Sequence, residues 1–222
     1  MPPLPRGEHA LHPLLVALLA LVLAAKPMVD LGLLPRGAMA VAMLLTIMVG
    51  LLGLAPREQR LRSLLVVTGV AAMGLQGLAL GVAGAETDLG ATAGAMLNFA
   101  ILAFAVLRQS LAPGRVTLRR IEGAIAAYLL IGLIFAGAYD LAAALAPGAF
   151  LQNGAPMAAQ ALGGDFTFFS FVTLTSTGYG DLVPAHPVAR SLAVLEAITG
   201  QLYLAIVLAR LVSLEIADRR PG

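Results

Sequence analysis

The stretch of sequence that decides the fold is residues 165–181, DFTFFSFVTLTSTGYGD. Its first part carries four phenylalanines between Phe166 and Phe171, at positions 166, 168, 169 and 171. Such a run is too apolar for an exposed loop, so it predicts a short helix, capped by Asp165, that enters apolar surroundings. The second part, residues 176–180, is polar and rich in glycine, which predicts irregular backbone after the helix.

The composition places the chain in a membrane. Of its 222 residues, 59% are hydrophobic and 12% are charged, whereas soluble proteins carry roughly 25% charged residues. A chain this apolar cannot bury its surface in one soluble core, so lipid must be part of its solvent. The absence of cysteine excludes disulfides, thiolate metal sites and cysteine nucleophiles. Its three histidines are scattered, so we expect no metal cluster. We also expect no cofactor, and no nucleic acid as a partner.

Six apolar segments approach the length that crosses a bilayer, about 20 residues. They are residues 10–25, 38–55, 63–84, 91–111, 121–145 and 189–214. The predicted fold is therefore an all-α membrane protein with six transmembrane helices, and with a re-entrant helix and loop between the fifth and the sixth. We divide it into a peripheral four-helix bundle, residues 1–112, and a second domain, residues 113–222.

The basic residues predict the orientation of these helices. If both termini are cytoplasmic, 11 of the 14 basic residues lie inside and three lie outside, in agreement with the positive-inside bias. The first segment is short and follows Arg6, so a signal peptide is the alternative. Removing it would put the next loops on the wrong side. We therefore predict a multi-pass protein of the cell inner membrane.

The order of residues 176–180 suits a row of backbone carbonyls that face one axis. Successive carbonyls point the same way when the backbone alternates between right-handed and left-handed angles, and left-handed angles are cheap only for glycine. Gly178 and Gly180 occupy alternate positions, with Thr177 and Tyr179 at the positions between. Carbonyls of residues 176–179, together with the Ser176 hydroxyl, would replace the water shell of a potassium ion.

The heptapeptide from Thr175 to Asp181 resembles the signature of the pore-loop potassium channel family, and the likeness extends over residues 119–214. The chain is most similar to small bacterial members with six transmembrane helices and no charged voltage sensor. One filter strand cannot surround an ion, so the resemblance implies a homotetramer, with K+ and membrane lipids as partners. The implied selectivity filter consists of Thr175, Ser176, Thr177, Gly178, Tyr179, Gly180 and Asp181, and the implied K+ ligands are Ser176, Thr177, Gly178 and Tyr179.

Two features depart from the family pattern. Ser176 and Thr177 replace the usual threonine and valine, which keeps the innermost hydroxyl but places a polar side chain behind the filter. Selectivity for potassium is then either retained, as Tyr179 favours, or relaxed. Several relatives have a pore-helix carboxylate that braces the counterpart of Asp181, where this chain has Val172. We therefore expect weak inactivation of the filter.

The sixth segment supplies the predicted cavity and gate residues, which are Glu196, Gly200, Gln201 and Leu204. A buried carboxylate is costly in a membrane, so Glu196 is expected to bond the short helix at Thr173, to face the cavity, or to pack between helices as the protonated acid. Gly200 follows Gly178 at the spacing where similar channels bend, so it is either a gating hinge or a small residue that permits close helix contact. By similarity, Gln201 is expected on the cavity wall.

The fourth segment lacks the charges of a voltage sensor, which needs arginines at every third position. Its basic residue is Arg108, at one end, so steep voltage gating is not expected. Before the fifth segment, Arg115, Arg119 and Arg120 either bind anionic lipid, at about 1 kcal/mol each, or anchor the topology.

The residues leave few rival functions. A weakly selective monovalent cation channel would share the fold and differ in its filter. A secondary transporter would need paired broken helices or inverted repeats, and the sequence contains neither. An enzyme is not expected, because cysteine is absent and neither clustered histidines nor a Ser-His-Asp arrangement can be proposed within the helices.

Overall fold

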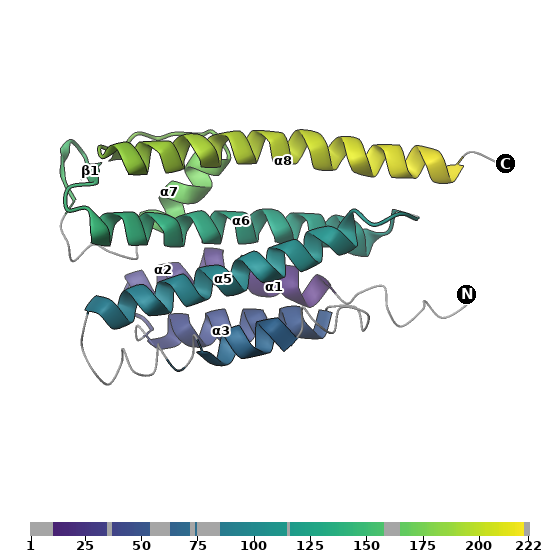
Figure 1. Cartoon of the computed structure of the whole chain (residues 1–222), viewed down its shortest axis with the longest axis horizontal. Helices are drawn as coiled ribbons and strands as arrows, with labels where there is room; N and C mark the ends of the chain where they lie inside the picture. The colour runs from purple at the N-terminus through teal and green to yellow at the C-terminus, as the bar shows by residue number, and fades with distance from the viewer. Residues whose placement is uncertain are drawn as a thin grey trace. The chain divides into compact units, whose positions relative to one another are not determined.

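The computed structural model describes residues 11–34, 37–53, 63–71, 74, 85–114, 116–157 and 165–219, and there the chain is mostly helical (Figure 1). The helices are α1 (His12–Ala20), the π-helical turn η1 (Leu21–Ala25), α2 (Lys26–Asp30), α3 (Gly37–Gly53), α5 (Ala85–Ser110), α6 (Leu118–Leu145), α7 (Asp165–Leu174) and α8 (Pro187–Arg219). Residues 63–71 are also helical. The strands are β1 (Phe150–Gln152), β2 (Ala155–Pro156) and β3 (Leu182–Pro184).

The chain forms two compact units, each assembled from segments that are far apart in the sequence. The first unit contains residues 1–67, 100–130 and 203–222, and the second contains residues 68–99 and 131–202. Helices α5, α6 and α8 contribute residues to both units. The predicted domain boundary at residues 112 and 113 lies in the connection between α5 and α6, and the division into a bundle and a second domain stays a prediction.

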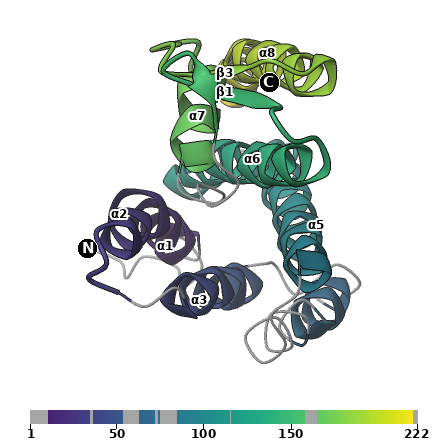
Figure 2. The same ribbon diagram turned by 90° about the vertical axis from the view of Figure 1, so that its left-hand side faces the viewer.

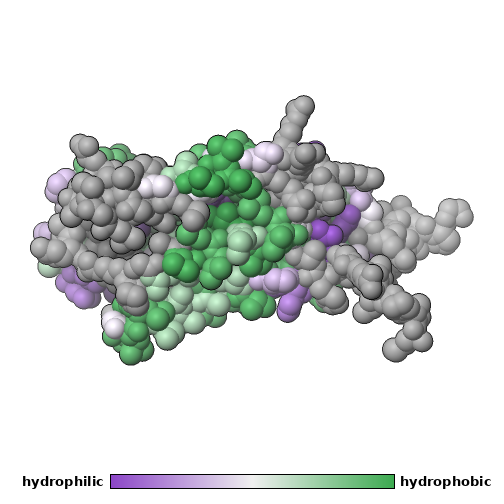
Figure 3. Space-filling view, turned by 90° about the horizontal axis from the view of Figure 1, so that it is seen from below, coloured by the Kyte–Doolittle hydropathy of each residue, from purple (hydrophilic) through white to green (hydrophobic). Residues whose placement is uncertain are grey.

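Four of the described helices are long and apolar enough to cross a membrane. They are His12–Val29, Leu89–Ser110, Leu118–Leu145 and Pro187–Ile216, which correspond to the first, fourth, fifth and sixth predicted spans. The second predicted span is α3, whose apolar part, Val41–Gly53, is shorter, and most of the third lies outside the described residues. Hydrophobic side chains gather on the surface in the space-filling view (Figure 3), as expected of a membrane protein.

The first helix continues past residue 25, where the first predicted apolar segment ends. Helices α1, η1 and α2 run without a break from His12 to Asp30. A proline lacks an N–H and its ring crowds the preceding helical turn. The π-helical turn η1 comes directly before Lys26-Pro27 and widens the backbone where the ring must fit. The predicted end of the helix was therefore wrong.

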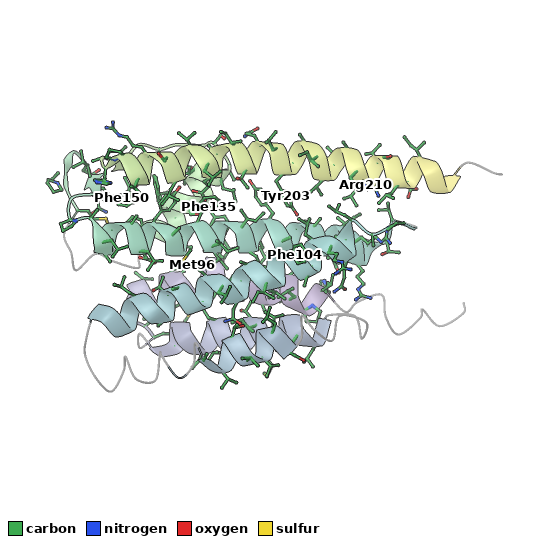
Figure 4. The ribbon with its side chains drawn as sticks, in the orientation of Figure 1. Met96, Phe104, Phe135, Phe150, Tyr203 and Arg210 are labelled. Carbon is green, nitrogen blue, oxygen red and sulfur yellow. The ribbon has the colours of Figure 1, made fainter. Side chains whose placement is uncertain are left out.

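In the second unit, α7 lies between α6 and α8 (Figures 1 and 2). Phe166 and Phe169 of α7 are buried in an aromatic cluster with Tyr139 and Phe150. The ring centroids of Tyr139 and Phe169 are 4.8 Å apart, and those of Phe150 and Phe166 are 4.6 Å apart. Figure 4 labels Phe135 and Phe150 at the same end of the α6 and α8 pair. Burial of these rings explains why so apolar a stretch folds as a short helix.

A small sheet beside the start of α8 departs from the all-α prediction. Strand β1 pairs antiparallel with both β2 and β3, in the order β2-β1-β3. Strands β1 and β2 are joined by Asn153-Gly154, whose φ angles of 50° and 81° are those of a type I′ hairpin turn. An Asn-Gly pair is a strong hairpin signal, so this dipeptide is the feature of the sequence that identifies the turn.

In the first unit, polar contacts join α1, α3 and α8 to α6. The Nδ1 atom of His12 lies 2.9 Å from Oε1 of Glu122, which is buried. The Arg119 guanidinium donates to the carbonyl of Gly53, the last residue of α3, at 3.1 Å. Tyr203, labelled between α8 and α6 in Figure 4, donates its hydroxyl to the Ala124 carbonyl at 2.6 Å.

Candidate functional site

The loop of residues 175–181 is positioned by the helix that precedes it. Its first backbone N–H groups turn back to carbonyls near the end of α7. Ser176 donates to Thr173 at 2.9 Å, and Thr177 donates to Val172 at 2.8 Å. The helix therefore satisfies the donors at the start of the loop, while the loop residues themselves are exposed on the single chain.

The backbone of this loop alternates in hand. Ser176, Gly178 and Gly180 have φ angles of 57°, 58° and 78°. Left-handed angles at the two glycines confirm the prediction made from their spacing. The left-handed angle at Ser176 was not predicted, because a residue with a Cβ adopts it at a cost of about 1–2 kcal/mol. The alternation thus begins at Ser176, two residues before the first of the two glycines.

The carbonyl groups of the loop, residues 175–180, accept no backbone hydrogen bond from the part of the chain that the structure describes. Exposed carbonyl oxygens of this kind bond either to water or to a cation. The loop therefore presents a short row of carbonyl oxygens that are available as ligands. Such oxygens can replace the water molecules of an ion's hydration shell.

Side-chain hydroxyls at the start of the loop form a short chain of hydrogen bonds. Thr175 Oγ1 donates to the Phe171 carbonyl at 2.7 Å and lies 2.9 Å from Thr177 Oγ1. Since the one hydrogen of Thr175 is used, the Thr177 hydroxyl is the donor between the two threonines. On the other side, Gln201 Nε2 of α8 donates to Ser176 Oγ at 2.9 Å. Both polar residues that depart from the family pattern are thus held by defined partners.

Glu196 lies behind the short helix, fully buried among α6, α7 and α8. The expected bond to α7 is present, but its partner is Ser170 at 2.5 Å instead of Thr173. Tyr139 of α6 donates to the second carboxyl oxygen, also at 2.5 Å. The alternative that Glu196 faces a cavity is wrong for this structure, because packing against two helices removes the carboxyl from solvent.

Gly200 permits a close contact between α8 and the end of α7. A methyl group at this position would overlap the Leu174 carbonyl oxygen and would lie 3.1 Å from the Leu174 Cδ1 atom. This geometry favours the second reading of Gly200, a small residue at a helix contact. The side chains of Gln201 and Leu204 are exposed on the single chain, and their place on a cavity wall or gate stays a prediction.

The far end of the loop is fastened by the sheet. The N–H of Asn153, in the hairpin turn, donates to the Asp181 carbonyl at 2.8 Å. Strand β3 begins at the next residue, Leu182, which pairs with Gln152 of β1. This contact is not predictable from the local sequence, because its donor lies in a hairpin about thirty residues away along the chain.

An exposed aromatic pair stands beside the loop. The rings of Phe168 and Tyr179 are stacked, with centroids 5.7 Å apart and planes 11° from parallel. The two side chains are 50% and 70% exposed, respectively. Leaving so large an apolar pair in water is costly. This face of the chain is therefore suited to contact with another apolar surface.

The arginines predicted as a lipid anchor have protein partners where the structure describes them. Arg119 donates to the Gly53 carbonyl and to Gln109, and Arg120 donates to the carbonyls of Gly114 and Pro113. Arg115 lies outside the described residues. Lipid binding by these side chains stays a prediction.

Comparison with known proteins relates the part of the chain that contains α7, the loop and most of α6 and α8 to one family. Residues 125–216 match the model of an ion channel family. The inward rectifier potassium channel Kirbac3.1 of Paramagnetospirillum magnetotacticum is 40% identical over 82 residues, which cover 36% of this chain and 24% of that protein. The match thus spans less than a quarter of the relative's length. No solved structure matches the chain.

Proposed function

We propose that four copies of this chain form a potassium-selective channel, because residues 125–216 match an ion channel family and 82 residues are 40% identical to a potassium channel. The channel conducts K+ passively across the cell inner membrane, with both termini in the cytoplasm. The chain contributes six transmembrane helices, and α7 with residues 175–181 re-enters the membrane between the fifth and the sixth.

The single observation that carries the proposal is the alternating backbone with unpaired carbonyls. The left-handed angles at Ser176, Gly178 and Gly180 fall at every second residue. Carbonyls of residues 175–180 accept no backbone hydrogen bond among the described residues. One such strand offers ligands from one side, so a cation that has lost its water needs further copies around the same axis.

Other features support the assembly. Helix α7 ends next to the loop, so the negative end of its dipole is directed toward the proposed ion path. The aromatic pair of Phe168 and Tyr179 is exposed on one chain, and a neighbouring subunit would cover it. Much of the surface of α8 is apolar and unburied, which suits contacts with other subunits and lipid.

Steep voltage gating is not part of the proposal. Moving one charge through the membrane field supplies about 2.3 kcal/mol per 100 mV, so a sensor needs several charges within a span. Within the described part of the fourth span, Leu89–Ser110, Arg108 in the last turn is the basic residue. This span therefore carries too little charge to supply a steep voltage-dependent force.

A weakly selective monovalent cation channel is the second candidate. It is favoured by the polar Thr177 side chain, whose hydroxyl is bonded to Thr175 where family members have valine. A hydroxyl in this place changes the packing behind the carbonyls and hence the spacing of the ion ligands.

Reconstitution of the full chain into lipid bilayers tests both candidates. With potassium on one side and sodium on the other, we expect a reversal potential close to that of a potassium electrode. The Tyr179→Asp variant should shift it toward zero, while Met48→Leu, on the exposed face of α3, should leave it unchanged. Equal permeability in the unaltered protein supports the second candidate. A monomeric particle, or no cation current, would overturn both.

A further inference from the structure

Two polar side chains contact Glu196 in the interior of the second unit. Tyr139 of α6 donates its hydroxyl to Glu196 Oε2 at 2.5 Å. Ser170 Oγ of α7 lies 2.5 Å from Glu196 Oε1 and 2.7 Å from the Gly132 carbonyl oxygen of α6. All three side chains are fully buried, so water cannot supply a missing hydrogen.

Counting hydrogens decides the protonation state of this cluster. The Ser170 hydroxyl has one hydrogen, and the Gly132 carbonyl can only accept it. If that hydrogen is directed to Gly132, the short contact between Ser170 and Glu196 needs a hydrogen on the carboxyl group. If Glu196 were ionised and took the hydrogen, the Ser170 and Gly132 oxygens would face each other at 2.7 Å with no hydrogen between them.

We propose that Glu196 is a neutral carboxylic acid and a positioning residue that locks α7 between α6 and α8. Its hydrogen bonds to Ser170 Oγ, the Ser170 hydrogen bonds to the Gly132 carbonyl, and Tyr139 bonds to the remaining acid oxygen. Every donor and acceptor in the cluster is then satisfied without a counter-ion. The inference deepens the proposed function and depends on it, because the locked helix carries the filter.

The surroundings of Glu196 agree with a neutral acid. From α6 the group that faces it is Tyr139, and from α7 it is Ser170. Along α8, the nearest basic residue is Arg190, whose Nε atom donates to the Pro184 carbonyl at 3.1 Å. Asp140, beside Tyr139 in α6, brings no positive charge. Among the described residues, no cationic side chain forms an ion pair with Glu196.

The lock is continuous with the ion path. Glu196 and Gly200 lie one turn apart on α8, and their contacts on α7, Ser170 and Leu174, are also one turn apart. The next residue of α8, Gln201, bonds to Ser176 in the filter. One face of α8 therefore follows α7 and the start of the filter in register, so a loosened acid would shift the filter backbone.

Infrared spectroscopy of the purified full chain tests the protonation state whether or not the protein conducts. We expect a carbonyl stretch of a protonated carboxylic acid at neutral pH that disappears in Glu196→Gln and persists in Glu215→Gln, a matched change on the same helix. Absence of this band from the unaltered protein would overturn the inference. Absence of potassium current, with the band present, would overturn only the proposed function.

Measurements of steady potassium current distinguish a positioning role of the Glu196 hydrogen bonds from a role of its side-chain volume alone. Glutamine both donates and accepts, so Glu196→Gln should keep the current within about twofold, whereas Glu196→Ala, which leaves two buried hydroxyls with a lost partner, should reduce it about tenfold or more. At alkaline pH the unaltered channel should lose steady current as the acid ionises, and Glu196→Gln should not. A glutamine variant as impaired as the alanine variant, or an unchanged pH profile, would contradict the inference. If Glu196→Ala does not assemble, the comparison of the pH profiles of the unaltered channel and Glu196→Gln tests the inference.

Discussion

Gln201 of α8 donates a hydrogen bond from Nε2 to the hydroxyl of Ser176, with 2.9 Å between the two atoms. Helix α8 is thereby joined to Ser176, the first residue of the proposed filter with a left-handed backbone angle. A small displacement of α8 at this level must be transmitted to the proposed ion ligands or must break the bond.

The first prediction concerns this pair. Gln201→Leu removes the donor with little change in volume, and Ser176→Ala removes the acceptor. Each should alter the relative permeability of potassium and sodium, and the double variant should change it little more than one single variant does. The expected coupling is about 0.5–1.5 kcal/mol. Reversal potentials of the four proteins measure it, and fully additive effects would show that the two residues act separately.

The second prediction concerns Gly200. Gly200→Ala introduces a methyl group where the Leu174 carbonyl lies, so α7 and α8 must separate. Overpacking of this kind costs about 1–3 kcal/mol, seen as a lower midpoint of thermal unfolding in detergent and as altered potassium conductance. The control is Gly69→Ala, where the new methyl meets Asn98 Oδ1 at an ordinary 3.6 Å. If both variants were equally stable, the proposed helix contact would not be required.

The third prediction concerns the outer end of the filter. Asn153→Pro removes the N–H that bonds the Asp181 carbonyl and cannot adopt the φ angle of 50°. It should destabilise the hairpin by more than about 1 kcal/mol and make potassium current decay during sustained opening. Asn153→Gly keeps both the N–H and the left-handed angle, so its current should stay steady. Decay in neither variant would mean that the sheet does not brace the filter.

The fourth prediction concerns the contact between the first helix and α6. His12 is the partner of Glu122 Oε1, and the carboxyl is buried. His12→Ala should therefore lower the free energy of unfolding by about 1–3 kcal/mol, the cost of a buried group without its partner. In the Glu122→Gln background, the same change should cost less, because the charge is gone. Thermal unfolding of the four proteins in detergent gives this comparison, in which equal costs would deny the pairing.

Local sequence patterns predicted the elements that carry the site. The aromatic run identified α7, the spacing of Gly178 and Gly180 identified the left-handed positions, and hydropathy located α5, α6 and α8. These features depend on residues close together in the sequence, so a window of sequence contains the cause of each.

Contacts between distant residues escaped prediction for the opposite reason. Tyr139 and Ser170 are 57 and 26 positions from Glu196, and only the packing of three helices brings them together. Thr173, the partner expected from the sequence, lies three residues beyond Ser170 on the same helix. The sequence predicted that a buried acid needs a partner, but which side chain faces it depends on the rotation of α7 about its axis.

The free carbonyls of residues 175–180 have a consequence for the durability of the protein. In an assembled pore they would form rings of like-oriented dipoles, whose mutual repulsion an ion between them relieves. The permeant ion would then belong to the folded structure as much as any side chain does. Removing potassium from the solution should weaken the proposed tetramer, and restoring it should return resistance to heat along with the current.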